Sequence, residues 1–189
     1  MLYLASQSPR RRQLLQQLGL GFAVLDVDVP EQREPTESPQ SYVSRVARDK
    51  ARAGLTTLGD TAGVLVLGAD TEVVLDDEVF GKPADAAEAA AMLRRLSGRT
   101  HEVISVVWLV GHGHEQSETS LSRVRFDTLD EVAIAAYVAT GEPFGKAGAY
   151  AIQGRGAALI AHLDGSYSGV MGLPVFETQR LLRSVNARR

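Results

Sequence analysis

The sequence predicts an α/β fold built on a mixed β-sheet, and three observations support this prediction. Segments with helical patterns alternate with segments with strand patterns along most of the chain. Residues 64–68 form a continuous apolar run, which is typical of a strand covered on both faces. Hairpin signals occur late in the chain, so some neighbouring strands are expected to run antiparallel.

Two Ser-Pro pairs mark helix starts in the first half of the chain. Ser8 and Ser38 can each cap a helix whose first residue is proline. In order, we expect a strand at 2–5, a helix from Ser8 to Gly19, a strand at 22–29, a loop at 31–37, a helix at 38–53, a loop at 54–63, a strand at 64–75 that turns at Asp76 and Asp77, and a loop at 80–83.

Capping boxes mark two helices in the second half. Asp85 with Glu88, and Thr128 with Glu131, have the spacing in which two side chains cap one helix start. In order, we expect a helix from 85 to 97, a strand at 103–110, a turn at 111–114, a second strand to 126, a helix from 128 to Gly141, a glycine-rich stretch at 145–156, a hairpin at 157–170 around Asp164 and Gly165, and a helix from Pro174.

Length and composition restrict the class of protein. The chain has 189 residues, so a single domain over 1–189 is expected. Its formal charge of −3 disfavours a dedicated nucleic-acid binder. The absence of cysteine excludes disulfides and thiolate chemistry. No secretory leader and no apolar run of about 18 residues is present, so we expect a cytoplasmic protein without a membrane partner.

Residues 6–11 read Ser-Gln-Ser-Pro-Arg-Arg and lie between an expected strand and an expected helix. A helix N-terminus carries unpaired N–H groups and a partial positive charge, which attract anions. Arg10 and Arg11 oppose this dipole, so a bound anion would stabilise them, and guanidinium groups suit phosphate oxygens. Ser6 and Ser8 add hydroxyl donors. We favour an anion site over the alternative of a capped surface helix with solvated arginines.

Lys50 and Asp70 are charged residues at positions expected to be buried. Lys50 lies on or beside the apolar stripe of its helix. A lysine at such a position more commonly extends its ammonium group to solvent, and the functional alternative is that the ammonium group contacts a bound phosphate. Asp70 ends the most apolar run of the chain. Because the strand continues beyond it, we favour function over a turn cap. Such a carboxylate can bind a metal or orient a water for attack on phosphorus.

Three further residues are weak signals when taken singly. Lys82 lies on a Gly-Lys-Pro loop a dozen residues after Asp70, and its alternative is a solvated surface lysine. Gln153 follows a glycine-rich segment and offers a donor and an acceptor, which suits a nucleobase edge; a structural amide is the alternative. Glu31, in a polar loop, is a candidate second carboxylate. His112 and His114 are expected to be solvated.

Together these segments resemble the Maf family of nucleoside triphosphate pyrophosphatases. The resemblance is ordered and runs from Leu2 to the last helix. It rests on residues 4–11 (LASQSPRR), 47–51 (ARDKA), 68–71 (GADT), 81–83 (GKP), 96–101 (LSGRTH), 146–154 (KAGAYAIQG) and 172–174 (GLP).

The resemblance implies an elongated mixed β-sheet flanked by helices, with a central nucleotide-binding cleft of the Maf and ITPase type. It implies cleavage of a nucleoside triphosphate between the α- and β-phosphates, giving a monophosphate and pyrophosphate, as a house-cleaning activity. It also implies a divalent cation, Mg²⁺ or Mn²⁺, a cytoplasmic location and a homodimer. The segment from Ala149 to Gly154 is similar to the dTTP/UTP branch rather than the 7-methyl-GTP branch.

The resemblance also implies roles for individual residues. Asp70 matches the proton acceptor, and Glu31 and Asp70 match carboxylates at the metal. The substrate-binding residues that it implies are Ser8, Arg10, Arg11, Lys50, Thr71, Lys82 and Gln153, of which Arg10, Thr71 and Gln153 match positions tied to substrate choice. The chain departs from the family at Pro30, where many members carry a second acid beside the one at Glu31, and at Ala151, where glycine is frequent.

The mechanistic hypothesis is in-line attack by a water that Asp70 positions and deprotonates. The phosphate-binding cations would stabilise the pyrophosphate leaving group. One alternative is the same fold acting on a modified purine triphosphate such as 7-methyl-GTP. Another is a regulator that binds a nucleoside triphosphate without hydrolysing it. A nucleic-acid-binding module is disfavoured by the acidic balance.

Overall fold

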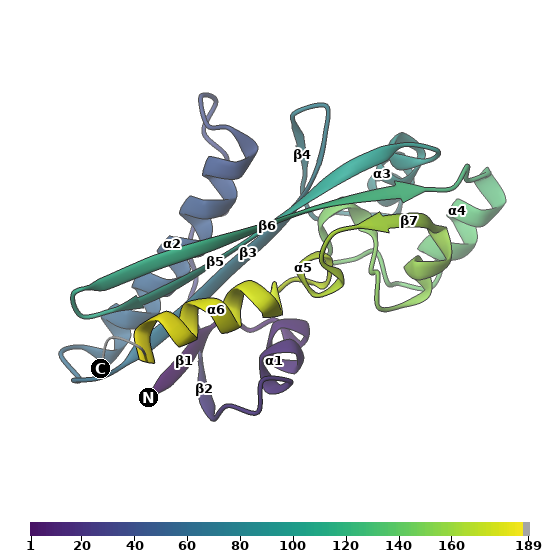
Figure 1. Cartoon of the computed structure of the whole chain (residues 1–189). Helices are drawn as coiled ribbons and strands as arrows, with labels where there is room; N and C mark the ends of the chain where they lie inside the picture. The colour runs from purple at the N-terminus through teal and green to yellow at the C-terminus, as the bar shows by residue number, and fades with distance from the viewer. Residues whose placement is uncertain (187–189) are drawn as a thin grey trace.

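The computed structural model describes residues 1–186, so residues 187–189 of the expected domain lie outside the described part. In this part, seven strands form one mixed sheet in the order β2-β1-β3-β5-β6-β7, with β4 paired to β3 (Figure 1). The strands are β1 (Leu2–Ala5), β2 (Phe22–Leu25), β3 (Leu65–Leu75), β4 (Glu78–Phe80), β5 (Thr100–Gly111), β6 (His114–Phe126) and β7 (Ile160–Asp164). β1 pairs parallel with β2 and β3, and the other pairs are antiparallel.

Helices cover both faces of this elongated sheet, with α2 on one face and α6 on the other (Figure 1). Side chains of successive strand residues alternate between the faces, so Val106 packs with α2 and Val107 belongs to the core on the opposite side. The helices are α1 (Pro9–Gln16), α2 (Pro39–Leu58), α3 (Ala86–Leu96), α4 (Glu131–Val138), α5 (Tyr167–Met171) and α6 (Val175–Asn186), with 3₁₀ turns at Ala147–Ala149 and Arg155–Leu159. The α/β class with a mixed sheet is confirmed.

One edge of β3 is left open between its two neighbours. β1 pairs with β3 as far as Leu67, and β4 pairs with it from Val73 onward. Among the described strands, none pairs with residues 68–72 on this edge, although β5 pairs with them on the other. The gap places Asp70 beyond the carboxyl end of β1, where ligands bind in open α/β sheets.

Local signals predicted the helix starts well. The side chains of Ser8, Ser38 and Asp85 each accept a hydrogen bond from a backbone N–H in the first turn of the helix that follows. The turn at Asp76 and Asp77 is also confirmed, with φ values of 52° and 63°. These positive values match the turns that join tight hairpins, and β4 follows at once.

Several expected boundaries were wrong. β2 ends at Leu25 rather than at residue 29, and α2 continues to Leu58 rather than ending near residue 53. Gly54 was read as the start of a loop, but it lies inside α2 because its missing side chain lets the helix pack closely on Val66. The strand β4 was missed: no element was expected at residues 78–79, and Phe80 was expected to lie in a loop.

Two expectations in the second half are corrected by hydrogen bonding. Asp130, not Thr128, caps α4, because its carboxylate accepts the N–H of Ala133 at 2.7 Å. The hairpin expected over 157–170 is a strand, β7, followed by a helix, α5. Ser166 caps α5 by accepting the N–H of Gly169 at 3.0 Å, so the chain continues here as a helix and not as the second strand of a hairpin.

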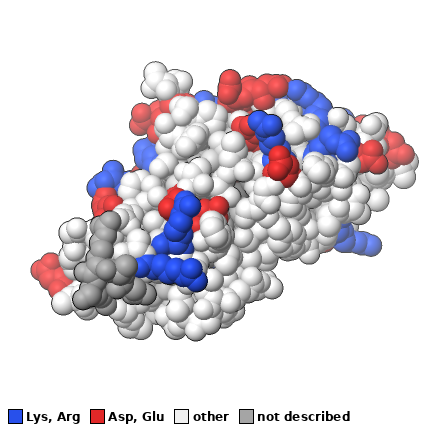
Figure 2. Space-filling view, in the orientation of Figure 1, with Lys and Arg blue, Asp and Glu red and all other residues white. Residues whose placement is uncertain are grey.

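None of the helices within residues 1–186 combines the length and the apolar composition that a membrane crossing requires. On the face seen in Figure 2, Lys and Arg side chains are interspersed with Asp and Glu.

Gly68 allows the close approach of α2 to β3 and gives a test of this packing. A Cβ atom there would lie 2.3 Å from the carbonyl oxygen of Ala47 and 2.5 Å from the backbone nitrogen of Ala51. We expect Gly68→Ala to lower the free energy of unfolding by about 3 kcal/mol, because helix backbone must move. Denaturant unfolding measures this change. Gly21→Ala, where a Cβ meets open space, is the control, and equal losses in both variants would contradict the packing.

Candidate active site

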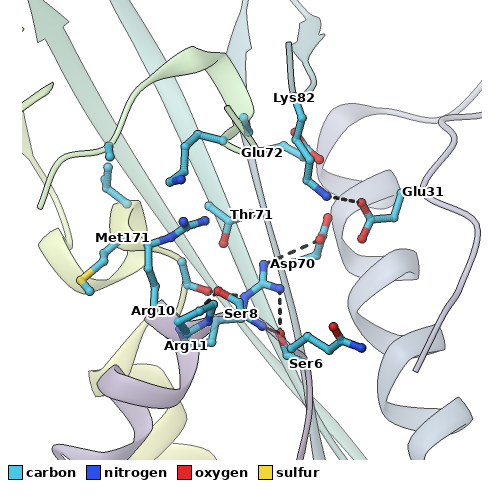
Figure 3. A pocket seen from close by; sticks show the side chains of 18 of the residues that line it. Ser6, Ser8, Arg10, Arg11, Glu31, Asp70, Thr71, Glu72, Lys82 and Met171 are labelled. Carbon is cyan, nitrogen blue, oxygen red and sulfur yellow. Dashed lines mark hydrogen bonds and ion pairs between the residues drawn. The ribbon is translucent and has the colours of Figure 1, made fainter. Parts of the chain in front are cut away.

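A cleft with a volume of about 570 Å³ lies at the open edge of β3, within the usual size range of ligand sites (Figure 3). It receives residues from α1, α2, β3 and the loops that follow β2, β4 and α4. Every site residue expected from the sequence lines it: Ser8, Arg10, Arg11, Glu31, Lys50, Asp70, Thr71, Lys82 and Gln153. The cleft therefore brings together residues from positions 8 to 153.

The start of α1 forms one wall. Ser8 caps the helix by accepting the N–H of Arg11 at 3.4 Å, and Ser6 Oγ accepts the N–H of Ser8 at 3.2 Å. Arg11 Nε donates to the carbonyl of Gly172 at 2.8 Å, which fixes the guanidinium. Arg10 extends into the cleft (Figure 3), and burial together with the charge of Arg11 lowers its pKa. Two cations at a helix N-terminus suit an anionic ligand.

A chain of ion pairs crosses the cleft. Lys50 Nζ lies 2.8 Å from Asp70 Oδ1 and 2.5 Å from Glu31 Oε1, and Lys82 Nζ lies 2.7 Å from Glu31 Oε2. Arg11 Nη2 lies 3.8 Å from Asp70 Oδ1. Burial raises the pKa of Glu31, but its hydrogen bonds with Lys50 and Lys82 outweigh this effect and lower the pKa to about 2.

Lys50 is therefore a buried, paired lysine rather than one that extends to solvent. It lies on α2 and is 8% exposed, and its partner Asp70 is 4% exposed. Charges this deeply buried are tolerated only when they are paired closely. The pair consequently holds the two side chains in one geometry.

Glu72 is a cleft residue that the sequence analysis missed. It is buried, and its side chain follows Asp70 by two positions on β3, which places both on the face that carries α2. Burial, and then the charge of Asp70, raises the pKa of Glu72 well above its usual range. The period of two in Asp70-Thr71-Glu72 is the signal that could have identified it.

Lys146 is a second addition to the expected set. It lines the cleft from the loop after α4, and its Nζ donates to the carbonyl of Phe144 at 3.1 Å. Burial and then the positive charge of Arg10 lower its pKa. Thr71 points to the opposite face of β3 from Asp70, where its hydroxyl lies 2.6 Å from that of Ser105.

The loop that carries Gln153 is fixed by side chains of α4 and its C-terminal loop. Glu142 Oε1 accepts the N–H of Arg155 at 2.9 Å, and Oε2 accepts the N–H of Gly156 at 3.3 Å. Tyr137 Oη accepts the N–H of Ala151 at 3.0 Å. The loop is thus tied on both sides of Gln153, whose amide stays exposed at the cleft.

The carboxylates of the cleft fit a hard divalent cation. Within residues 1–186, Asp70 Oδ2 and Glu72 Oε2 are buried oxygens without a hydrogen-bond partner. The same residues contain no group of three or more His, Asp or Glu side chains placed to hold a metal ion. Two carboxylates with open oxygens suit Mg²⁺, which usually binds one or two carboxylates together with phosphate and water.

Fold and cleft together define an α/β protein with a cationic site for a polyanion and buried carboxylates at its centre. A family model described as "Maf-like protein" matches residues 1–185. The chain belongs to the Maf family, and the resemblance found in the sequence is confirmed.

Relatives match over almost their whole length. The "dTTP/UTP pyrophosphatase" of Xanthomonas campestris pv. campestris is 59% identical over 189 residues, which cover 99% of this chain and 100% of the relative. The "Nucleoside triphosphate pyrophosphatase" of Xylella fastidiosa (strain M23) is 57% identical over 183 residues, which cover 96% and 97%. Among solved structures, the Staphylococcus aureus Ham1 protein matches 66% of this chain and 71% of its own, with a TM-score of 0.45 and 15% identity.

Glu142 gives a test of how the Gln153 loop is held. We expect Glu142→Ala to raise the amide exchange rates of Arg155 and Gly156 by about tenfold or more, because both lose a charged acceptor. Hydrogen exchange followed by NMR measures these rates. The amide of Gly148, which donates to the carbonyl of Gly81 at 3.2 Å, is the internal control and should not change. Unchanged exchange at Arg155 and Gly156 would contradict the role of Glu142.

Proposed function

We propose that this protein hydrolyses nucleoside triphosphates between the α- and β-phosphates, releasing a nucleoside monophosphate and pyrophosphate. The proposed substrates are dTTP and UTP. The observation that carries the proposal is the convergence of four cations, Arg10, Arg11, Lys50 and Lys82, around the buried carboxylate of Asp70. The names of the curated relatives, which include dTTP/UTP pyrophosphatase, support the same reaction and substrates.

The cations of the cleft suit a triphosphate. Such a ligand carries roughly four negative charges, and guanidinium and ammonium groups are its natural partners. Glu31 holds Lys50 and Lys82 in the cleft by pairing with both ammonium groups. These lysines are therefore placed before substrate arrives, which reduces the ordering that binding requires.

Asp70 is proposed to accept the proton of the attacking water. Its Oδ1 atom is engaged by Lys50, which orients the carboxylate. Its Oδ2 atom has no hydrogen-bond partner among residues 1–186 and is free to accept a proton. Arg10, Arg11, Lys50 and Lys82 would stabilise the charge that develops on the pyrophosphate leaving group.

The cofactor of the proposal is Mg²⁺ or Mn²⁺, held by carboxylates of the cleft together with the phosphates of the substrate. When bound, such a cation neutralises phosphate charge and polarises the phosphorus–oxygen bonds. The sequence resemblance predicts Asp70 and Glu31 as the metal ligands, and this assignment stays a prediction. A cytoplasmic location and a homodimer complete the proposal, and neither nucleic acid nor membrane is a proposed partner.

The first experiment is a hydrolysis panel with purified protein and Mg²⁺ or Mn²⁺. The substrates are dTTP, UTP, CTP, GTP and 7-methyl-GTP, and products are identified chromatographically. We expect monophosphate and pyrophosphate from dTTP and UTP. Activity confined to 7-methyl-GTP would replace the proposed substrates with a modified purine. Nucleotide binding without turnover would replace the enzyme with a nucleotide-binding regulator.

Asp70→Asn tests the catalytic role. We expect it to retain nucleotide binding but to lower kcat by about 100-fold or more, because the amide cannot accept the water proton. Steady-state kinetics measure kcat, and calorimetry with a non-hydrolysable triphosphate measures binding. Asp60→Asn, at an exposed position outside the cleft, is the control. Near-normal turnover in Asp70→Asn would remove Asp70 from the mechanism.

Gln153→Ala tests whether the Gln153 amide recognises the nucleotide base. The amide at the cleft rim can donate to and accept from a pyrimidine edge, so its loss should reduce the preference for dTTP and UTP over the other nucleotides by about tenfold. Ratios of kcat/KM across the panel measure the preference. Gln13→Ala, on the exposed side of α1, is the matched control. If Gln153→Ala ranks the nucleotides as the unaltered protein does, this residue does not select the base.

A further inference from the structure

Two buried carboxylates on β3 each keep an oxygen without a hydrogen-bond partner. Asp70 is 4% exposed and Glu72 is 7% exposed, and both line the cleft. Within residues 1–186, Asp70 Oδ2 and Glu72 Oε2 find neither a donor nor a solvent-exposed surface. A buried oxygen in this state loses its water hydrogen bonds without replacement, which is costly unless a ligand completes the site.

Glu31 differs from this pair because both of its carboxylate oxygens are already paired. It lies in a loop, and one of its oxygens is taken by Lys50 and the other by Lys82, at 2.5 and 2.7 Å. A cation at Glu31 would lie beside two ammonium groups, which would repel it. Among these three carboxylates, the open coordination positions belong to β3.

We propose that Glu72 is a ligand of the divalent cation, together with Asp70, and that Glu31 positions the lysines instead. This inference rests on the proposed function, since it concerns the metal of that reaction. It assigns the cation to two residues of one strand rather than to one strand residue and one loop residue.

The position of both residues on β3 suits chelation. β5 pairs with β3 through both positions, with Asp70 opposite Val106 and Glu72 opposite Ile104, so the backbone is held. Residues two apart on a strand have Cα atoms about 7 Å apart and side chains on one face. Aspartate and glutamate side chains of this separation can reach a common ion between them.

The chemistry of the pair selects a hard cation that arrives with phosphate. Carboxylate oxygens are the ligands of Mg²⁺ and Mn²⁺, and Mg²⁺ rarely uses an all-protein cage. The described part of the chain contains no group of three or more His, Asp or Glu side chains placed to hold a metal ion. Asp70 can still serve the attacking water, because each carboxylate oxygen offers two lone pairs.

The test measures cation binding directly. Mn²⁺ affinity is determined by electron paramagnetic resonance for the full chain, Glu72→Gln and Glu31→Gln, each with a non-hydrolysable α,β-imido analogue of dTTP. Nucleotide affinity is measured separately in the presence of a chelator. Glu102→Gln, on the neighbouring strand β5 and outside the cleft, is the matched control.

We expect Glu72→Gln to weaken Mn²⁺ binding by about tenfold or more, because a charged ligand is lost. Its metal-free nucleotide affinity should not fall. Glu31→Gln should retain its Mn²⁺ affinity within about twofold and lose nucleotide affinity, because two phosphate-binding lysines lose their anchor. Mn²⁺ affinity in Glu72→Gln equal to that of the control, or an equal loss in Glu31→Gln, would overturn the assignment.

The proposed function can fail independently. If the unaltered protein neither binds the dTTP analogue nor releases pyrophosphate from any triphosphate, the function is wrong, whatever the Mn²⁺ data show. If the unaltered protein turns over dTTP while Glu72→Gln keeps full Mn²⁺ affinity, only the role of Glu72 is wrong. Thermal unfolding in chelator confirms that the glutamine variant is folded.

Discussion

The buried ion pair between Lys50 and Asp70 is the constraint on which the cleft depends. It joins α2 to the centre of β3, where neither charge could remain without the other. Gly68, two residues before Asp70, lets the backbone of α2 come close enough for the pair to form. The packing of α2 and the geometry of the site thus depend on the same feature. Because Gly68 carries no side chain, α2 lies close enough to β3 for Lys50 to reach Asp70.

The cleft itself results from the lengths of the strands beside β3. β1 and β4 are both short, and they pair with opposite ends of β3. The residues between are held by β5 on one side only, so polar side chains at 70–72 reach the cleft from a rigid strand. A longer β1 would close this edge. The short strand also ends shortly before α1 begins, which places the helix N-terminus in the same cleft as Asp70.

Local chemistry could be predicted from the sequence, and packing could not. The starts of α1 and α3 could be predicted from Ser8 and Asp85, because a capping side chain contacts only the first turn of its own helix. The strand β4 and the last turn of α2 depend on contacts with residues outside these segments. Gly54, for example, favours a loop by its type, but its close packing against Val66 explains its place in α2. The expected site residues line one cleft, and their roles stay predictions. Glu72 was missed although the alternation along β3 places it on the same face as Asp70, because its burial depends on packing that the sequence does not show.

The charges of the cleft explain why a divalent cation is needed at all. Its five cations, Arg10, Arg11, Lys50, Lys82 and Lys146, face three inner carboxylates, and Asp26 and Asp28 lie at the exposed rim. Much of the positive charge is therefore already paired within the protein. A triphosphate brings roughly four negative charges, which the remaining cations cannot neutralise alone. The buried oxygens of Asp70 and Glu72 are where the missing positive charge would be most stabilising, since within residues 1–186 neither oxygen has a hydrogen-bond partner.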